Sequence, residues 1–165
     1  MVWIIIGIII SYLIGSIPTA YIFGYLLKGT DIRKFGSGNV GATNAFRMLG
    51  KWAGITVLLL DILKGFVVVF FLGNIPLLEN TPLQDEARRI ILGLACIFGH
   101  NWTVFLKFNG GKGVATTLGV LLGLSFKVAG LKVVLGLALL TWVLVFVLSR
   151  IVSLASLVTS FSFPL

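Results

Sequence analysis

The sequence has little acidic charge, one histidine and one cysteine. Its 165 residues include five Asp or Glu in total, and His100 and Cys96 are the single members of their types. One cysteine excludes an internal disulfide framework, and we expect it simply to pack in an apolar run. One His, one Cys and scattered carboxylates offer no metal-ligand spacing, so no metal site is predicted. Only 11% of residues are charged, whereas 58% are hydrophobic and the mean hydropathy is +1.11, which excludes an ordinary soluble domain.

Long apolar runs make up most of the chain. They cover residues 3–27, 52–72, 90–106, 114–126, 133–149 and 151–165. Because a helix needs roughly 20 residues to cross a bilayer core, we predict an all-α integral membrane protein, a transmembrane bundle with six helical segments, some of them short. Residues 1–165 are expected to form a single transmembrane domain. Pro18 stands inside the first run, so a kink is expected where neighbouring helices or hydroxyls satisfy the freed carbonyl.

The net charge of +8 is better interpreted through its placement than as a sign of nucleic-acid binding. Three connections between the runs hold Lys28, Arg33, Lys34, Arg47 and Lys51, then Lys107 and Lys112, then Arg150. The connections on the opposite face hold Arg88, Arg89, Lys127 and Lys132. Since cytoplasmic loops carry the excess of Lys and Arg, the more basic face is predicted to be cytoplasmic and the N-terminus to lie outside. Membrane lipids, and no nucleic acid, are the expected surroundings.

The first polar stretch is GSGNVGATN, residues 36–44. Glycines allow backbone N–H groups to close on an oxyanion, and Arg47 follows with a planar guanidinium suited to phosphate. The glycines are Gly36, Gly38 and Gly41, and the side chains that add donors are Ser37, Asn39, Thr43 and Asn44. A flexible cytoplasmic loop whose glycines only make turns is the alternative, and the stretch alone does not decide between the two.

The second polar stretch is GHNWTVFLKFNGGKGVATT, residues 99–117, between the third and fourth runs. Its glycines, Gly110, Gly111 and Gly113, flank Lys112 and lead into a helix whose N-terminal amides favour an anion, with Thr116 one turn inside. Gly113 stands where a Walker A motif needs Ser or Thr, so ATP is disfavoured. The alternative is a tight loop between membrane helices. Two such loops on one face favour a phosphate site.

Three ionisable residues lie in or beside the apolar runs. His100 lies near the end of the third run and precedes Lys112 by twelve residues, so it is either structural or part of the site, where it could hold a substrate hydroxyl or accept its proton. Asp61 and Lys64 are three positions apart in the second run, on one helical face. We expect them to form a structural pair facing the bundle interior, because ionisable groups at that depth are costly unless paired or functional.

These stretches, with GSIPTAYIFG at 15–24, LLDILKG at 59–65 and RIVSLAS at 150–156, resemble the bacterial acyl-phosphate-dependent glycerol-3-phosphate acyltransferases, the PlsY family. The resemblance covers nearly the whole chain. It implies an all-helical inner-membrane enzyme that moves a fatty acyl group from acyl phosphate to the 1-hydroxyl of glycerol 3-phosphate. The products would be lysophosphatidate and phosphate, in the first acylation of phospholipid synthesis, and no cofactor is implied.

Residue by residue, the resemblance implies catalytic roles for Ser37, Arg47, His100 and Lys112. The substrate-binding residues it implies are Gly36, Gly38, Asn39, Gly41, Thr43, Asn44, Asn101, Gly110, Gly111, Gly113, Thr116 and Ser153. The resemblance also implies a final helix and a basic cytoplasmic tail, so we expect seven helical segments in the full-length family member and expect this chain either to be truncated or to lack the tail.

The predicted chemistry needs little acid catalysis, because an acyl phosphate already has a good leaving group. The protein must hold two phosphates close together and stabilise charge on the carbonyl and the departing phosphate. Asp61 is expected to lie too deep to form a Ser–His–Asp arrangement, so direct transfer without an acyl-enzyme is predicted. A small transporter or channel subunit for an organic phosphate is the alternative, although no repeat and no polar midplane site are evident. A non-catalytic assembly partner is a third possibility, in which Gly7, Gly15 and Gly24 would pack helices.

Overall fold

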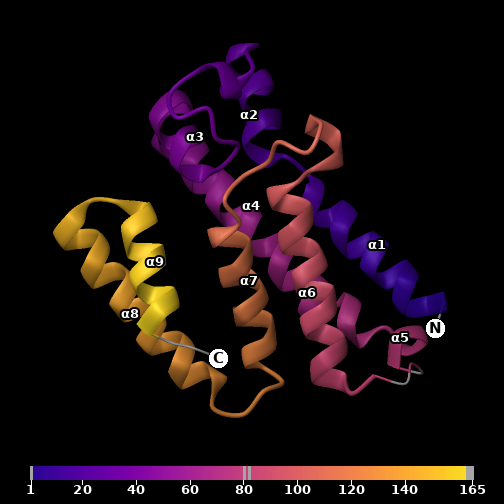
Figure 1. The fold of residues 1–165 in the computed structure, drawn as a ribbon. Coiled ribbons are helices and arrows are strands. Elements are labelled where there is room, and N and C mark those ends of the chain that lie inside the picture. Colours follow the sequence, from indigo (N-terminus) through magenta and orange to yellow (C-terminus); the bar gives the residue numbers. More distant parts are fainter. Residues whose placement is uncertain (1, 80, 82, 163–165) are drawn as a thin grey trace. The chain divides into compact units, whose positions relative to one another are not determined.

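The computed structural model describes residues 2–79, 81 and 83–162, and every regular element among them is helical. Figure 1 shows the α-helices, which are α1 (Val2–Ser16), α2 (Thr19–Lys28), α3 (Ala42–Leu49), α4 (Lys51–Phe70), α5 (Pro76–Glu79), α6 (Asp85–Asn101), α7 (Val114–Ser125), α8 (Leu131–Ser149) and α9 (Val152–Ser162). The 3₁₀ helices are η1 (Ile32–Lys34), η2 (Leu72–Asn74) and η3 (Val104–Leu106). The predicted all-helical fold is confirmed.

Four helical stretches are long and apolar enough to cross a membrane. They are Val2–Lys28, Lys51–Asn74, Asp85–Leu106 and Leu131–Ser149. Helices α7 and α9 are apolar but shorter. Many large apolar side chains on these helices are exposed, as expected of surfaces that face lipid. The chain is therefore an integral membrane protein in its described part.

The predicted apolar runs correspond to helices, with the following main differences. The run 3–27 is two helices, α1 and α2, because Pro18 cannot donate a backbone N–H. The run 90–106 begins earlier, since α6 starts at Asp85. The connection 28–51, predicted as a loop, contains α3. The end of the last run, 163–165, lies outside the described residues.

The break between α1 and α2 frees backbone carbonyls, and side chains from α4 and from the segment after α6 satisfy them. Thr103 donates its hydroxyl to the Ser16 carbonyl at 2.6 Å. Lys64 donates to the Ile17 carbonyl at 3.3 Å. The expectation that neighbouring groups would satisfy carbonyls freed near Pro18 is confirmed, and the break draws α4 and the end of α6 to this point.

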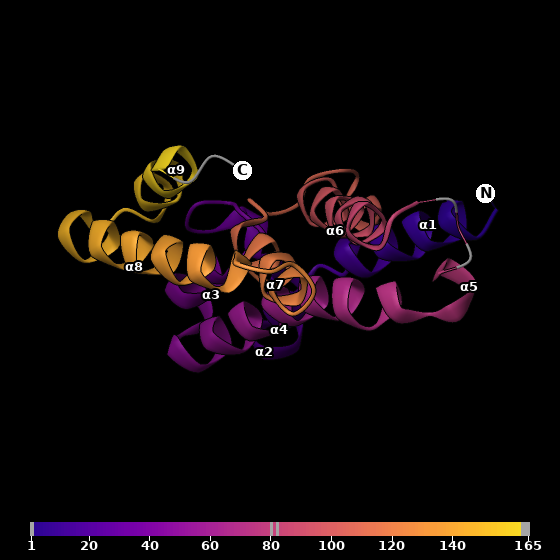
Figure 2. The same ribbon diagram turned by 90° about the horizontal axis from the view of Figure 1, so that it is seen from below.

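The chain divides into two compact units, one ending at Leu124 and the other beginning at Ser125. In the first unit α1 packs along α6, and Figure 2 shows these two helices side by side. A Cβ added at Gly15 would lie 2.0 Å from the Cys96 carbonyl oxygen, and one at Gly99 would lie 2.1 Å from that of Tyr12. Glycine is needed at both positions for close backbone approach, as is common between membrane helices. Cys96 is fully buried in this packing, as predicted.

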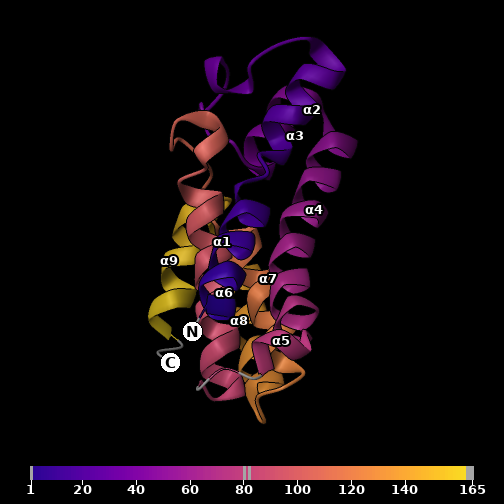
Figure 3. The same ribbon diagram turned by 90° about the vertical axis from the view of Figure 1, so that its right-hand side faces the viewer.

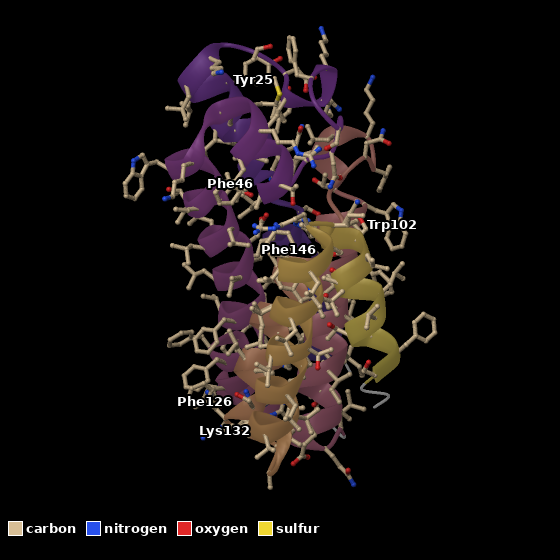
Figure 4. The ribbon with its side chains drawn as sticks, turned by 90° about the vertical axis from the view of Figure 1, so that its left-hand side faces the viewer. Tyr25, Phe46, Trp102, Phe126, Lys132 and Phe146 are labelled. Carbon is tan, nitrogen blue, oxygen red and sulfur yellow. The ribbon has the colours of Figure 1, made fainter. Side chains whose placement is uncertain are left out.

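The second unit, from Ser125, contains α8 and α9, which pack against each other. The Trp142 indole N–H donates to the Ser156 hydroxyl at 3.1 Å. Figure 4 shows Phe126 close to Lys132 at the start of α8, where the Lys132 Nζ lies 5.3 Å from the ring centre. Residues 1–165 forming one domain stays a prediction.

Two of the basic residues assigned to the opposite face from the sequence are buried. Arg88 and Arg89 have exposed fractions of only 3% and 1%, and both pair with Asp85 on the same helix. Arg89 also donates to the Val69 carbonyl at 2.7 Å and to the Asn74 side-chain oxygen at 2.6 Å. These guanidiniums therefore tie the start of α6 to the end of α4.

An apolar cluster in the first unit lies beneath the two polar connections 28–51 and 107–113. Its members come from α2, η1, α3, α4 and both glycine-rich connections: Ala20, Ile32, Val40, Ala45, Val57 and Leu106. Val40 belongs to the first glycine-rich stretch and Leu106 to the second. Because both are buried in one cluster, the two connections have a common apolar base.

Candidate active site

The first glycine-rich stretch is organised around the buried side chain of Asn44. Its amide nitrogen donates to the Ile32 carbonyl at 3.1 Å and the Phe35 carbonyl at 3.2 Å. Its oxygen accepts the Ser37 backbone N–H at 3.0 Å. Gly36 has a φ of +61°, and a Cβ there would lie 2.2 Å from the Asn44 Oδ1. Asn44 therefore holds the loop, and Ser37 lies exposed on it.

Helix α3 begins inside the same stretch, with Gly41 as its N-cap residue. Thr43 and Arg47 are four positions apart on α3 and both are exposed, so they share one face of the helix. Asn39 is half-buried just before it. The sequence predicted one open loop here, and the structure instead gives Arg47 a helical support.

The second stretch folds back onto the last turn of α6. Gly110 donates its N–H to the Asn101 carbonyl at 3.1 Å, and Gly111 donates to the His100 carbonyl at 3.0 Å. A Cβ at Gly110 would lie 2.0 Å from the His100 carbonyl oxygen, and a Cβ at Gly111 would lie 2.1 Å from the His100 Nε2. Both amides are therefore donated to the end of α6, and the substrate-binding role of Gly110 and Gly111 stays a prediction. The glycines are required by the closeness of the turn.

The two glycine-rich stretches meet. A Cβ added at Gly111 would lie 2.9 Å from the carbonyl oxygen of Val40 in the first stretch. Figures 1 and 3 show both connections at the same end of the first unit, beyond the ends of α4 and α6. The helices thus bring Ser37 and Arg47, from one stretch, to the same end as His100 and Lys112, from the other. Lys112 is exposed, like Ser37 and Arg47.

A buried chain of polar side chains, made by Thr19, Asp61, Lys64 and His100, lies beneath this turn. Thr19 donates its hydroxyl to the Asp61 Oδ1 at 2.8 Å, and the Lys64 Nζ lies 2.9 Å from the same oxygen. The Lys64 Nζ also lies 2.7 Å from the His100 Nδ1. Asp61, Lys64 and His100 are 1%, 7% and 7% exposed. The predicted interior pair of Asp61 and Lys64 is confirmed.

The contact of the Asp61–Lys64 pair with His100 was not predicted from the sequence. Asp61 was expected to lie too deep for a Ser–His–Asp arrangement, yet its Oδ1 lies 3.7 Å from the His100 Nδ1. The other ring nitrogen, Nε2, faces Gly111 rather than a serine. The spacing of two charges on α4 gave no signal that α6 would bring its only histidine to them.

Two predicted binding residues carry buried side-chain oxygens for which the described residues supply no hydrogen-bond partner: Asn101 Oδ1 and Thr116 Oγ1. A Cβ at Gly113, which has a φ of +73°, would lie 2.5 Å from the Asn101 oxygen. Buried polar atoms are rarely left unpaired, so the Asn101 oxygen is suited to accept a hydrogen bond from a ligand. Thr116 is fully buried behind α4, where Gly65 touches its backbone.

The cations near the first stretch differ in their surroundings. Arg33 forms a salt bridge with Asp31, with its NH2 nitrogen 2.7 Å from the Oδ2. Hydrogen bonds from the Arg33 side chain hold the pKa of the Asp31 carboxyl below its ordinary value. Lys28 donates to the Met48 carbonyl. Arg33 and Lys28 therefore stabilise the loop, whereas Arg47 is exposed. Ser153 is exposed on α9, in the second unit, and stays a prediction.

An apolar groove of about 360 Å³ lies between α4 and the break that separates α1 from α2. Its apolar lining consists of Ile14, Ile17, Ile22, Phe23, Leu60, Leu63 and Val67. Thr19 and Lys64 are its polar lining. The groove therefore reaches Lys64, whose Nζ contacts the His100 ring. Among the residues that the structure describes, no group of three or more His, Cys, Asp or Glu is placed to hold a metal ion.

Fold and site together define a class: an integral membrane protein of packed helices in which two polar connections meet at one end, with exposed cations above a buried Asp–Lys–His chain. Residues 5–165 match the family model described as glycerol-3-phosphate acyltransferase. The chain belongs to this family.

The sequences of relatives match this chain over almost its whole length. The glycerol-3-phosphate acyltransferase of Chlorobium phaeobacteroides (strain BS1) is 49% identical over 99% of this chain and 69% of its own length. The corresponding protein of Chlorobium limicola is 48% identical over 94% of this chain and 66% of its own length. The chain thus spans about two thirds of the length of these curated relatives.

A crystal structure of PlsY, an integral membrane glycerol 3-phosphate acyltransferase in its glycerol 3-phosphate form, is 39% identical, with a TM-score of 0.80. The match covers 96% of this chain and 73% of that one. Its lysophosphatidic acid form matches with 38% identity and a TM-score of 0.78. The fold predicted from the resemblance is confirmed.

Proposed function

We propose that this protein transfers a fatty acyl group from acyl phosphate to the 1-hydroxyl of glycerol 3-phosphate. The observation that carries the proposal is the contact of the two glycine-rich stretches at Gly111 and Val40. It brings the connection that bears Arg47 to the connection that bears Lys112, and both cations are exposed. The relatives' names and the glycerol 3-phosphate form of the matched structure support the acceptor.

The reaction suits a site that binds anions rather than one that supplies a nucleophile. The substrate hydroxyl oxygen attacks the acyl carbon, the bond from that carbon to the phosphate oxygen breaks, and phosphate leaves. The hydroxyl proton passes to an oxygen of the departing phosphate. Arg47 offers a bidentate fork and Lys112 a point charge for the two phosphates. Holding both substrates in line is the main contribution expected of the protein.

The apolar groove offers a place for the acyl chain. Its lining from α1, α2 and α4 is almost wholly apolar, and its polar end is formed by Thr19 and Lys64. Burial of each CH₂ group stabilises a bound chain by about 0.8 kcal/mol. A chain in this groove would bring its carboxyl end toward the Lys64 contact with His100.

We place the site at the cytoplasmic face of the bacterial inner membrane. The basic connections at 28–51 and 107–113 lie at the same end of the first unit, as Figure 3 shows for the ribbon. Cytoplasmic loops carry the excess of Lys and Arg, so this end faces the cytoplasm and the N-terminus lies outside.

The test is a transfer assay on the purified chain in nanodiscs, with palmitoyl phosphate and labelled glycerol 3-phosphate. The expected products are lysophosphatidate and one released phosphate for each acyl group transferred. Palmitoyl-CoA in a parallel reaction tests the donor. Labelled glycerol 3-phosphate that enters sealed proteoliposomes without forming lysophosphatidate would instead support the transporter.

A matched pair of variants tests the anion site. Arg47→Ala is expected to lower turnover by about 100-fold or more, the scale of losing one donor to developing charge. Lys34→Ala, which removes an exposed cation from the same connection, is expected to keep wild-type turnover. Equal rates for both variants would remove Arg47 from the site.

A further inference from the structure

The Lys64 ammonium has three close acceptors. Its Nζ lies 2.9 Å from the Asp61 Oδ1, 3.3 Å from the Ile17 carbonyl oxygen and 2.7 Å from the His100 Nδ1. An ammonium group has three donors and no acceptor. The three contacts therefore account for all three protons, and the His100 Nδ1 must be the acceptor in its contact.

The charge on Lys64 is supported by its surroundings. Asp61 supplies the opposite charge and is itself held by the Thr19 hydroxyl at 2.8 Å. Both members of the pair are buried, and a buried charge persists where it is paired and hydrogen-bonded. The break at Pro18 adds the Ile17 carbonyl as a further acceptor. A neutral Lys64 would leave the Asp61 carboxylate buried without its cation.

We propose that Lys64 is a positioning residue that fixes His100 in the tautomer with its proton on Nε2. In a neutral imidazole one nitrogen donates and the other accepts, and the hydrogen bond at one nitrogen decides the state of the other. With Nδ1 accepting from Lys64, Nε2 carries the proton and faces the Gly111 turn. His100 therefore presents a hydrogen-bond donor to the site and no base.

The consequence for the reaction rests on the proposed function. A His100 that donates through Nε2 stabilises negative charge on a carbonyl or phosphate oxygen instead of removing the proton of the acceptor hydroxyl. That proton then passes to the departing phosphate. Asp61 and Thr19 act through Lys64 and do not touch the substrates.

Direct observation of the tautomer is possible because His100 is the only histidine in the chain. The protein is labelled with ¹⁵N-histidine, purified with a histidine-free tag and examined by two-bond ¹H–¹⁵N correlation spectroscopy. The expected spectrum has an unprotonated Nδ1 and a protonated Nε2. A spectrum with the proton on Nδ1, or with both nitrogens protonated, overturns the proposal whether or not the protein transfers acyl groups.

The variants separate positioning from folding. Lys64→Met alone leaves the Asp61 carboxylate buried without its cation, so this variant is expected to unfold at a lower temperature than the wild type. The double variant Asp61→Asn with Lys64→Met removes both charges together. Its His100 is expected to lose the single-tautomer spectrum, and kcat is expected to fall about 10- to 100-fold, the range for partners that orient metal-bound histidines, with KM for glycerol 3-phosphate little changed.

Lys51→Met, at the exposed start of the same helix, is the control and is expected to keep both the spectrum and kcat. A double variant with the wild-type spectrum would overturn the role of Lys64. If the wild-type protein shows no transfer at all, the proposed function fails, while its histidine spectrum still decides the tautomer.

Discussion

The sharpest test of the site geometry is the substitution Gly111→Ala. A Cβ at this position would lie 2.1 Å from the His100 Nε2, 2.8 Å from the Cε1 and 2.9 Å from the Val40 carbonyl oxygen. The φ of Gly111 is not in the left-handed region, so alanine adds no backbone strain there. The effect is therefore steric. Either the imidazole or the glycine-rich turn must move to make room.

The expected magnitudes follow from these contacts. Forcing one extra methyl group into a packed site costs about 1–3 kcal/mol of stability. If the imidazole moves by about 1 Å, activity falls by about 100-fold. The displaced ring also leaves its contact with Lys64 at 2.7 Å, so the histidine spectrum should change. Stability is measured by thermal unfolding in detergent and activity by the transfer assay.

Gly136→Ala is the matched control. Nothing lies within 4 Å of a Cβ added at Gly136, which is inside α8. Alanine in a helix is favoured over glycine by about 0.5–1 kcal/mol, so this variant should be as stable as the wild type or more so. Wild-type kcat together with an unchanged His100 spectrum in Gly111→Ala would refute the close approach of the turn to the imidazole.

Two further variants test the first connection. Asn44→Ala removes two donated hydrogen bonds and one accepted bond, each worth about 1 kcal/mol, so it should unfold several degrees lower, whereas the exposed Asn109→Ala should not. Asp31→Asn removes the carboxylate that Arg33 binds. Because the hydrogen bonds from Arg33 lower the pKa of Asp31 from its ordinary value of 3.8, the wild type should be the more stable at pH 7. This advantage should disappear as pH falls through the lowered pKa, and a gap that persists in acid would contradict the pairing.

Much of the fold could be predicted from the sequence, because helix crossing of a bilayer demands long apolar runs and these are visible. The α3 helix could not be. Its eight residues, Ala42–Leu49, include Thr, Asn and Arg, and a glycine lies at each end of the helix. No apolar run therefore marks it in the sequence. What stabilises α3 is tertiary: Ala45 is buried with Val40 and Val57 in the cluster beneath the loops.

The site residues named from the sequence stay predictions, and the contacts that these residues make could not be predicted. Glycine-rich sequence suggested free amides, whereas Gly110 and Gly111 donate theirs to the end of α6. Asn44 was named as a substrate-binding residue, which stays a prediction, and its amide hydrogens are donated to the loop carbonyls of Ile32 and Phe35. Sequence shows which residues lack side chains or carry amides. It does not show which neighbouring groups will lie within hydrogen-bonding distance or close against a glycine.

Lys64 lies between the groove proposed for the acyl chain and the turn proposed to bind phosphate. It lines the apolar groove and contacts the His100 Nδ1, while the Nε2 of the same ring faces the turn that leads to Lys112. An acyl chain in the groove and a phosphate beside the exposed cations would therefore meet at the His100 ring. A carbonyl that passes from the Lys64 side of the ring to the Nε2 side would accept the ring N–H. On this geometry the histidine lowers the barrier by stabilising charge, and the proton transfer is left to the substrates themselves.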